Sequence, residues 1–87
     1  MNWNDAIARG DRIGRIDYVS PGDLVFLVNE HKGRLLAFTV TRIEHHQGLT
    51  TLWQSETRNY TIGGSSRLRF DFALRDEAAG WQDGEEA

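Results

Sequence analysis

The sequence predicts an all-β domain, mainly antiparallel, built as a small sheet that curls on itself. Two observations support this fold class. Apolar and polar residues alternate through residues 66–75, which is the period of a strand with one buried and one exposed face. Short segments of similar character recur along the chain, separated by turns that contain glycine or proline. We therefore expect five or six short strands joined as a meander.

The N-terminal part of the chain predicts one short helix. Asn4 is a suitable N-cap and Gly10 a natural stop, so the helix should span about residues 4–9. Residues 12–19 are expected to form a first strand. The sequence Ser20-Pro21-Gly22-Asp23 then predicts a tight turn, because proline and glycine suit its two central positions.

The remaining strands follow from apolar periodicity and from the turns between them. Residues 24–29 are apolar on both faces, as a strand covered on both sides would be. Residues 34–44 form the longest candidate, and the loss of phase at Ile43 indicates a bulge or bend near Thr41. Hairpin loops with a glycine, at residues 30–33 and 45–48, flank that segment. The later strands are predicted at residues 49–55, 58–62 and 66–75.

A meander of this size hides its two edges and its apolar face most simply by closing into a barrel. The expected architecture resembles that of the SH3-like and Sm-like small barrels, a likeness of shape and not of sequence motifs. Residues 1–75 are expected to form this one domain. Residues 76–87 are expected to form an acidic, flexible tail, because carboxylates and small residues dominate there.

Composition restricts the compartment and the chemistry. The chain has no cysteine, which excludes disulfides, zinc–thiolate sites and cysteine nucleophiles. The N-terminus lacks the pattern of a signal peptide. The longest unbroken apolar run, residues 24–28, is far too short to cross a bilayer. We therefore expect a cytoplasmic protein.

Charge is divided unevenly along the chain. Residues 1–75 hold ten Lys or Arg against eight Asp or Glu, whereas residues 76–87 hold five carboxylates and no base. A mildly basic body therefore carries an acidic tail. In that tail Trp81 stands among Asp83, Glu85 and Glu86. The segment could dock on a basic partner with the indole as anchor, or it could serve only to keep the protein soluble.

The polar face of the last predicted strand carries Arg67, Arg69 and Arg75, which Arg58 or Arg42 of neighbouring strands could join. Such a face could bind phosphates, with Trp53 or Tyr60 stacking on bases. The alternative is a solvated face whose arginines pair with acidic residues of neighbouring strands. The small net charge of residues 1–75 favours that alternative. Trp53 could equally be buried or form an exposed platform for a partner.

Other candidate sites have weaker signals. His31, His45 and His46 lie in two hairpin loops without the further ligands of a metal site. The Gly63-Gly64 segment lacks the lysine and the following helix of a phosphate-binding loop. No combination of nucleophile, base and orienting carboxylate indicates catalysis. We expect neither a metal nor another cofactor.

These observations predict a non-enzymatic binding module that acts by protein–protein interaction. It would serve as a regulator or inhibitor of a larger assembly, such as one that handles nucleic acids. The first alternative is a small nucleic-acid-binding barrel that uses the arginine face. A second is a protein that captures a small anionic ligand such as a nucleotide. An exposed strand edge could also pair two copies, so both a monomer and a homodimer are compatible with the sequence.

Overall fold

The computed structural model describes residues 3–8, 12–30, 33–75 and 85–86 of the 87-residue chain. Antiparallel strands make up most of it, which confirms the all-β class expected from the sequence. The elements, in chain order, are α1 (Trp3–Ile7), the 3₁₀ helix η1 (Ile16–Tyr18), β1 (Leu24–Asn29), β2 (Arg34–Thr39), β3 (Arg42–His46), β4 (Leu49–Trp53), β5 (Asn59–Ile62), β6 (Leu68–Leu74) and β7 (Glu85–Glu86).

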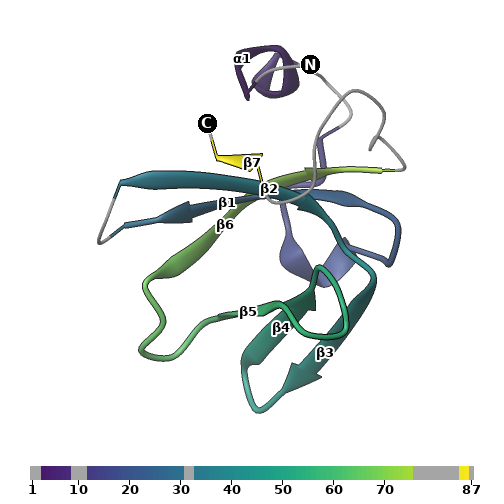
Figure 1. The fold of residues 1–87 in the computed structure, drawn as a ribbon, viewed down its shortest axis with the longest axis vertical. Coiled ribbons are helices and arrows are strands. Elements are labelled where there is room, and N and C mark those ends of the chain that lie inside the picture. The colour runs from purple at the N-terminus through teal and green to yellow at the C-terminus, as the bar shows by residue number, and fades with distance from the viewer. Residues whose placement is uncertain (1–2, 9–11, 31–32, 76–84, 87) are drawn as a thin grey trace.

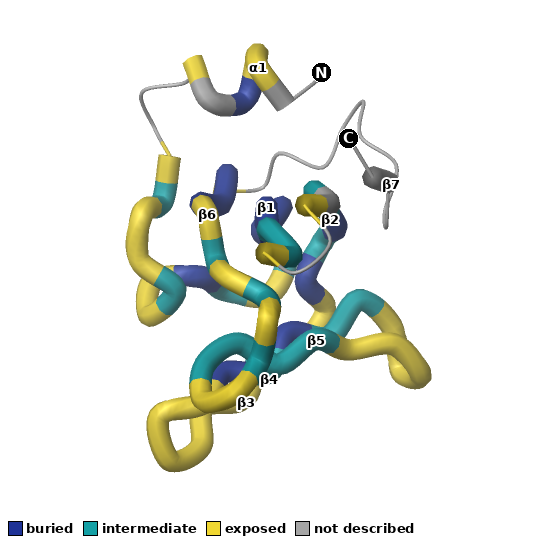
Figure 2. Tube along the Cα trace, turned by 90° about the vertical axis from the view of Figure 1, so that its left-hand side faces the viewer, coloured by how far each residue is buried: buried dark blue, intermediate teal, exposed yellow. Residues whose placement is uncertain are grey.

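The strands form two sheets that pack face to face, with α1 on the far side of the larger sheet. The four-stranded sheet has the order β6-β1-β2-β7, and the three-stranded sheet has the order β3-β4-β5. Figure 1 shows α1 above the four-stranded sheet and β3 to β5 below it, and the turned view in Figure 2 shows the same layers. The meander curls because β6 returns to pair with β1. The two sheets remain separate in the described chain, so the barrel is not closed.

Strand β1 is covered on both faces. Leu24, Val25, Phe26 and Leu27 are each fully buried. Leu24 and Phe26 pack in a cluster with Ala6 of α1, whereas Val25 and Leu27 point the other way, into the core between the two sheets. An apolar run without alternation is typical of a strand in this position, as the sequence predicts.

Strand β6 departs from the simple alternation expected of it. Phe72 lies opposite Phe26, but the next pair along β1 joins Leu27 to Phe70, which leaves Asp71 as an extra residue. This β-bulge exchanges the two faces of the strand. Phe70 therefore packs between the sheets, while Phe72 stacks on Phe26 on the helix side, with 4.3 Å between ring centroids. The expectation that the alternating apolar residues of 66–75 share one buried face is wrong, because alternation holds only while the register is unbroken.

The segment before β1 is not the strand expected from residues 12–19. Of these residues only Ile13 pairs with a strand, through reciprocal backbone hydrogen bonds of 2.9 and 2.8 Å with Ala73. The chain then forms η1 and enters the predicted turn. In that turn Gly22 has a φ of 98°, and the N–H of Asp23 donates to the carbonyl of Ser20 at 3.1 Å.

Residues 34–44 form two strands and not one. Strand β2 ends at Thr39 and β3 begins at Arg42, so the predicted break near Thr41 is confirmed. Thr41 donates to the carbonyl of Trp53 from its backbone N–H at 2.8 Å and from its hydroxyl at 3.1 Å. The break carries the chain from the four-stranded sheet into the three-stranded sheet, where β3 occupies an edge.

The C-terminal strand β7 lies in the part of the chain for which the sequence predicts a flexible tail. Glu85 and Glu86 pair with Ala37 and Leu36 of β2. An open strand edge offers unpaired backbone groups to an extended segment, and this is the physical reason for the pairing.

Candidate functional site

The solvent-facing side of the three-stranded sheet carries the candidate site. On its other side Ile43, Leu52 and Tyr60 lie opposite one another and pack in the core. Because successive residues of a strand face opposite sides, the residues that alternate with these three face solvent. We call this set the Trp53 surface; its members are Arg42, Glu44, Thr51, Trp53, Asn59 and Thr61.

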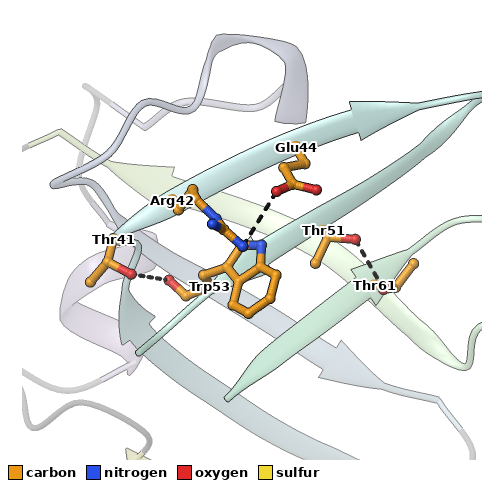
Figure 3. Close-up of polar contacts among 6 residues, drawn as sticks. All are labelled: Thr41, Arg42, Glu44, Thr51, Trp53 and Thr61. Atoms are coloured by element: carbon orange, nitrogen blue, oxygen red, sulfur yellow. Dashed lines mark hydrogen bonds and ion pairs between the residues drawn. The ribbon is translucent and has the colours of Figure 1, made fainter. Parts of the chain in front are cut away.

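Trp53 is the centre of this surface. Its side chain is half-buried, and Arg42 of the neighbouring strand lies over the indole, with Cζ 4.0 Å from the ring centroid. A guanidinium at this distance makes a cation–π contact. Arg42 Nη2 also lies 3.3 Å from Glu44 Oε1, as Figure 3 shows, so an ion pair helps to hold the guanidinium over the ring. Arg42 and Glu44 are each 58% exposed, which leaves both charges accessible to a partner.

The rest of the Trp53 surface is small and polar. Asn59 lies directly opposite Trp53 on β5. The hydroxyls of Thr51 and Thr61 are 3.2 Å apart, a hydrogen bond that joins β4 to β5 (Figure 3). Side chains of this size and polarity leave the indole as the one large apolar group of the Trp53 surface.

A groove of about 390 Å³ lies at one end of the Trp53 surface. Its lining consists of Thr41, Arg42, Trp53, Ser55 and Glu56. Ser55 and Glu56 come from the turn between β4 and β5. That turn is closed by hydrogen bonds of 2.9 and 3.3 Å, which the N–H groups of Gln54 and Ser55 donate to the carbonyl of Arg58. The groove is therefore built from two chain segments that the sheet brings together.

Two buried polar atoms at this end of β4 have no hydrogen-bond partner among the described residues. They are the indole nitrogen of Trp53 and the side-chain oxygen of Gln54. Buried donors and acceptors in native proteins are almost always satisfied, by protein, by water or by a ligand. The Trp53 indole N–H is thus a buried donor that no described protein atom satisfies.

The turn at Gln47–Gly48 determines which side chains meet on the Trp53 surface. Both residues have a positive φ, 49° and 79°, as a two-residue type I′ hairpin requires. With this turn His46 pairs with Leu49, and counting back along both strands brings Arg42 opposite Trp53. The expected loop covers all of residues 45–48, so the sequence prediction does not pair Arg42 with Trp53. A two-residue turn is the signal from which this pair follows.

The arginines predicted to form one basic face do not gather. Arg69 lies opposite Val28 and pairs with Glu30 at 2.7 Å. Arg75 donates to the carbonyl of Tyr18 at 2.9 Å and lies 3.9 Å from the buried carboxylate of Asp23. The bulge in β6 is the reason for the separation, because it places Arg69 and Arg75 on opposite faces of the sheet.

The remaining predicted residues lie in different parts of the molecule. Arg67 is exposed just before β6, and Arg58 is exposed in the turn before β5. Glu85 and Glu86 pair with β2 in the other sheet, and Figure 1 shows β7 in the upper part of the molecule and the strands β3 to β5 at the bottom. Trp81 and Asp83 lie outside the described residues. Of the residues predicted for the site, the structure therefore places Trp53 and Arg42 on the Trp53 surface, whereas Tyr60 packs against the core.

The Trp53 surface offers an aromatic ring, a guanidinium and a carboxylate, so it can bury an anchor and form charged hydrogen bonds at its rim.

In the described part of the chain no three His, Cys, Asp or Glu side chains cluster as metal ligands. No helix there has the length and apolar character needed to cross a membrane. Comparison of the chain with protein-family models, curated proteins and solved structures finds no match.

Proposed function

We propose that this protein is a non-enzymatic binding module that contacts another protein through the Trp53 surface. The observation that carries the proposal is the half-buried indole held under Arg42 on the open side of a sheet, next to a groove. Tryptophan and arginine are the residues most enriched at the energetic centres of protein interfaces. They bury a large area and still keep polar groups that can bond to the partner.

The groups around Trp53 match the anatomy of such an interface. An interface centre consists of an aromatic anchor that loses its water on binding, and polar groups surround it. Here Arg42 and Glu44 supply the charged rim, and Thr51 and Thr61 supply hydroxyls.

The balance of charge favours a protein over a nucleic acid as the ligand. Arg42 is the one cation on the Trp53 surface, and it is paired with Glu44, while Glu56 lines the groove. Binding to a phosphate backbone needs several cations that act together. A small module of this kind works by occupying a surface of its partner, so we extend the proposal to a regulator or inhibitor of a larger assembly.

The test compares the recovery of partners by matched variants. Tagged wild-type protein, Trp53→Ala and Tyr18→Ala are expressed in the native host and purified after nuclease treatment. Tyr18 is the matched control, because it is also a large aromatic residue and is 61% exposed, but it lies on η1 outside the Trp53 surface. We expect wild type and Tyr18→Ala to retain one stoichiometric protein partner. We expect Trp53→Ala to bind it roughly 30-fold more weakly, as loss of an interface centre does.

Two results would contradict this proposal. Equal capture by Trp53→Ala and Tyr18→Ala, with both variants folded by circular dichroism, would place the interface elsewhere. Fluorescence anisotropy with short single-stranded DNA and RNA at two salt concentrations tests the alternative ligand. A strong salt-dependent affinity that is lost in Arg42→Ala would indicate a nucleic-acid ligand instead.

A further inference from the structure

Strand β3 has one edge that no strand covers in the described chain. It ends the order β3-β4-β5, and β4 is the one strand with which it pairs. Four of its five residues are exposed. An exposed edge is a template for a further strand, because its outward N–H and C=O groups have no partner from a sheet.

The hairpin geometry shows which backbone groups of β3 reach this edge. Hydrogen-bonded and non-hydrogen-bonded pairs alternate along antiparallel strands, and a hydrogen-bonded pair flanks a two-residue turn. Here that pair is His46 and Leu49. Counting back, Glu44 and Arg42 point their backbone groups at β4, whereas Ile43 and His45 point theirs away from it. An added strand would therefore bond to Ile43 and His45.

The side chains of β3 complement a second β3 strand. Arg42 and Glu44 lie two residues apart, on the same face, with Ile43 between them. If two β3 strands pair antiparallel with Ile43 opposite Ile43, each Arg42 lies opposite the Glu44 of the other copy. Opposite charges at directly paired positions stabilise a sheet. A shift that sets Glu44 opposite Glu44 would instead bring like charges together and leave Arg42 without its carboxylate partner across the strands.

We propose that two copies of this protein pair through their β3 edges in the register centred on Ile43. The two three-stranded sheets then become one continuous sheet related by a two-fold axis. Paired residues share a face, so both Trp53 surfaces lie on the same side of that sheet. The two Arg42–Glu44 pairs between the copies extend the pair that each copy already contains. This inference does not depend on the proposed function.

The contact is short, so the dimer is weak. The free edge is limited on one side by the bend at Thr41 and on the other by the turn at Gln47–Gly48. A ladder of this length buries less than the area of a standard stable interface, and we expect a dissociation constant of roughly 0.1–1 mM.

Sedimentation measurements on the full chain test the association. The weight-average mass should rise from 9.9 kDa toward twice that value between roughly 10 µM and 2 mM protein at low salt. We expect Arg42→Glu and Glu44→Arg each to weaken the dimer roughly fivefold or more. Each substitution creates two pairs of like charges between the two copies. The charge-swapped protein with both substitutions should recover to within roughly twofold of wild type.

Substitutions with the same change of charge serve as controls. Arg58→Glu alters an exposed residue in the turn between β4 and β5, and Asp17→Arg alters an exposed residue of η1, so neither changes β3 or the groove beside it. We expect both proteins to dimerise as wild type does. A weakening equal to that of Arg42→Glu would show that net charge, and not the register, controls association, and would overturn the proposal.

Amide hydrogen exchange of the wild-type protein gives a second test that needs no substitution. In the register centred on Ile43 only residues 42–44 of each copy overlap, because His45 falls opposite the bend at Thr41. Protection of the Ile43 amide should therefore increase with protein concentration, while that of the Arg42 and Glu44 amides stays constant. A protein that remains at 9.9 kDa at every concentration would overturn the proposal. A dimer insensitive to both charge reversals, or concentration-dependent protection confined to other strands, would do the same.

Discussion

At the scale of single residues, Gly63 determines how closely the end of β5 approaches the hairpin between β3 and β4. Its φ is 107°, a conformation that residues with a Cβ rarely adopt. A Cβ built there would lie 3.0 Å from the carbonyl oxygen of Gly48 and 3.3 Å from Cδ2 of Leu49. The sequence predicts a break between strands at this glycine. Only the structure shows that the position also has no room for a side chain, because two turns pack together there.

Replacing Gly63 by alanine should therefore destabilise the fold. We expect Gly63→Ala to lower the free energy of unfolding by about 1–3 kcal/mol, because the backbone is strained and a neighbouring backbone atom must move. Gly14→Ala is the matched control, since a Cβ at Gly14 would meet no atom within 4 Å and its φ is not positive. That substitution should change stability by less than about 1 kcal/mol. Urea denaturation measures both, and equal losses would contradict this account.

The roles of Trp53 and Arg42 depend on how two strands pair, and not on the residue types alone. The residue types are visible in the sequence, and either one could serve in an interface or in a structural contact. Their stacking at 4.0 Å depends on the register of β3 against β4. A residue's role here follows from its cross-strand neighbour, which the chain acquires only when the hairpin forms.

At the scale of elements, the bulge in β6 decides which side chains the strand buries. Before the bulge, Phe70 faces the core between the sheets; after it, Phe72 and Leu74 face the helix side, and Ala73 faces the core. A bulge also increases local twist, which helps β6 to return alongside β1 and curl the meander. The alternation of apolar residues therefore predicts the strand correctly. It assigns the residues on one side of the bulge to the wrong face.

Deletion variants can test this interpretation of β6. Without Asp71, Phe70 and Phe72 become neighbours and still alternate opposite Leu27 and Phe26, so the register closes. We expect the Asp71 deletion to remain folded and to lose about 1–3 kcal/mol in unfolding free energy, as local twist changes. Deleting Ala73, which lies beyond the bulge, should unfold the domain, because it moves the charge of Arg75 to the buried position opposite Leu24.

Circular dichroism and urea denaturation distinguish the two deletions. The decisive comparison is the presence of a cooperative transition in the Asp71 deletion and its absence in the Ala73 deletion. Two proteins that are equally unfolded would show that the extra residue is needed for the fold itself and not only for its local twist.

At the scale of the whole molecule, the four-stranded sheet depends on cover from both sides. The three-stranded sheet covers one face, and α1 covers the other with the fully buried Ala6. A helix of five residues has little stability of its own, so it exists here because it packs on the sheet. The apolar residues that it helps to cover include Phe26 and Phe72.

A charge at the helix–sheet contact should separate the layers. We expect Ala6→Asp to lower the free energy of unfolding by about 2–4 kcal/mol, because a carboxylate would be buried without a partner. It should also increase binding of the dye ANS, as apolar surface of the sheet becomes exposed. Ala8→Asp is the control, since Ala8 follows α1 and is exposed. If both variants bind ANS equally, α1 does not protect the sheet.

The sequence alone determines the fold class, most of the turns and the position of most strands. These features depend on local chemistry: alternation of apolar residues, β-branched and aromatic content, and glycine or proline where the backbone must turn. The doubly covered β1, the break near Thr41 and the turn at residues 20–23 were all predictable for this reason.

Only the tertiary structure decided the faces, the registers and the candidate site. The bulge in β6 and the η1 helix in place of a first strand depend on contacts between segments distant in sequence. The pairing of Arg42 with Trp53 depends on which residues form the hairpin turn between β3 and β4. A shift of one residue exchanges every side chain between core and solvent, yet it leaves local composition unchanged. The register is therefore selected by the free energy of packing the assembled sheets.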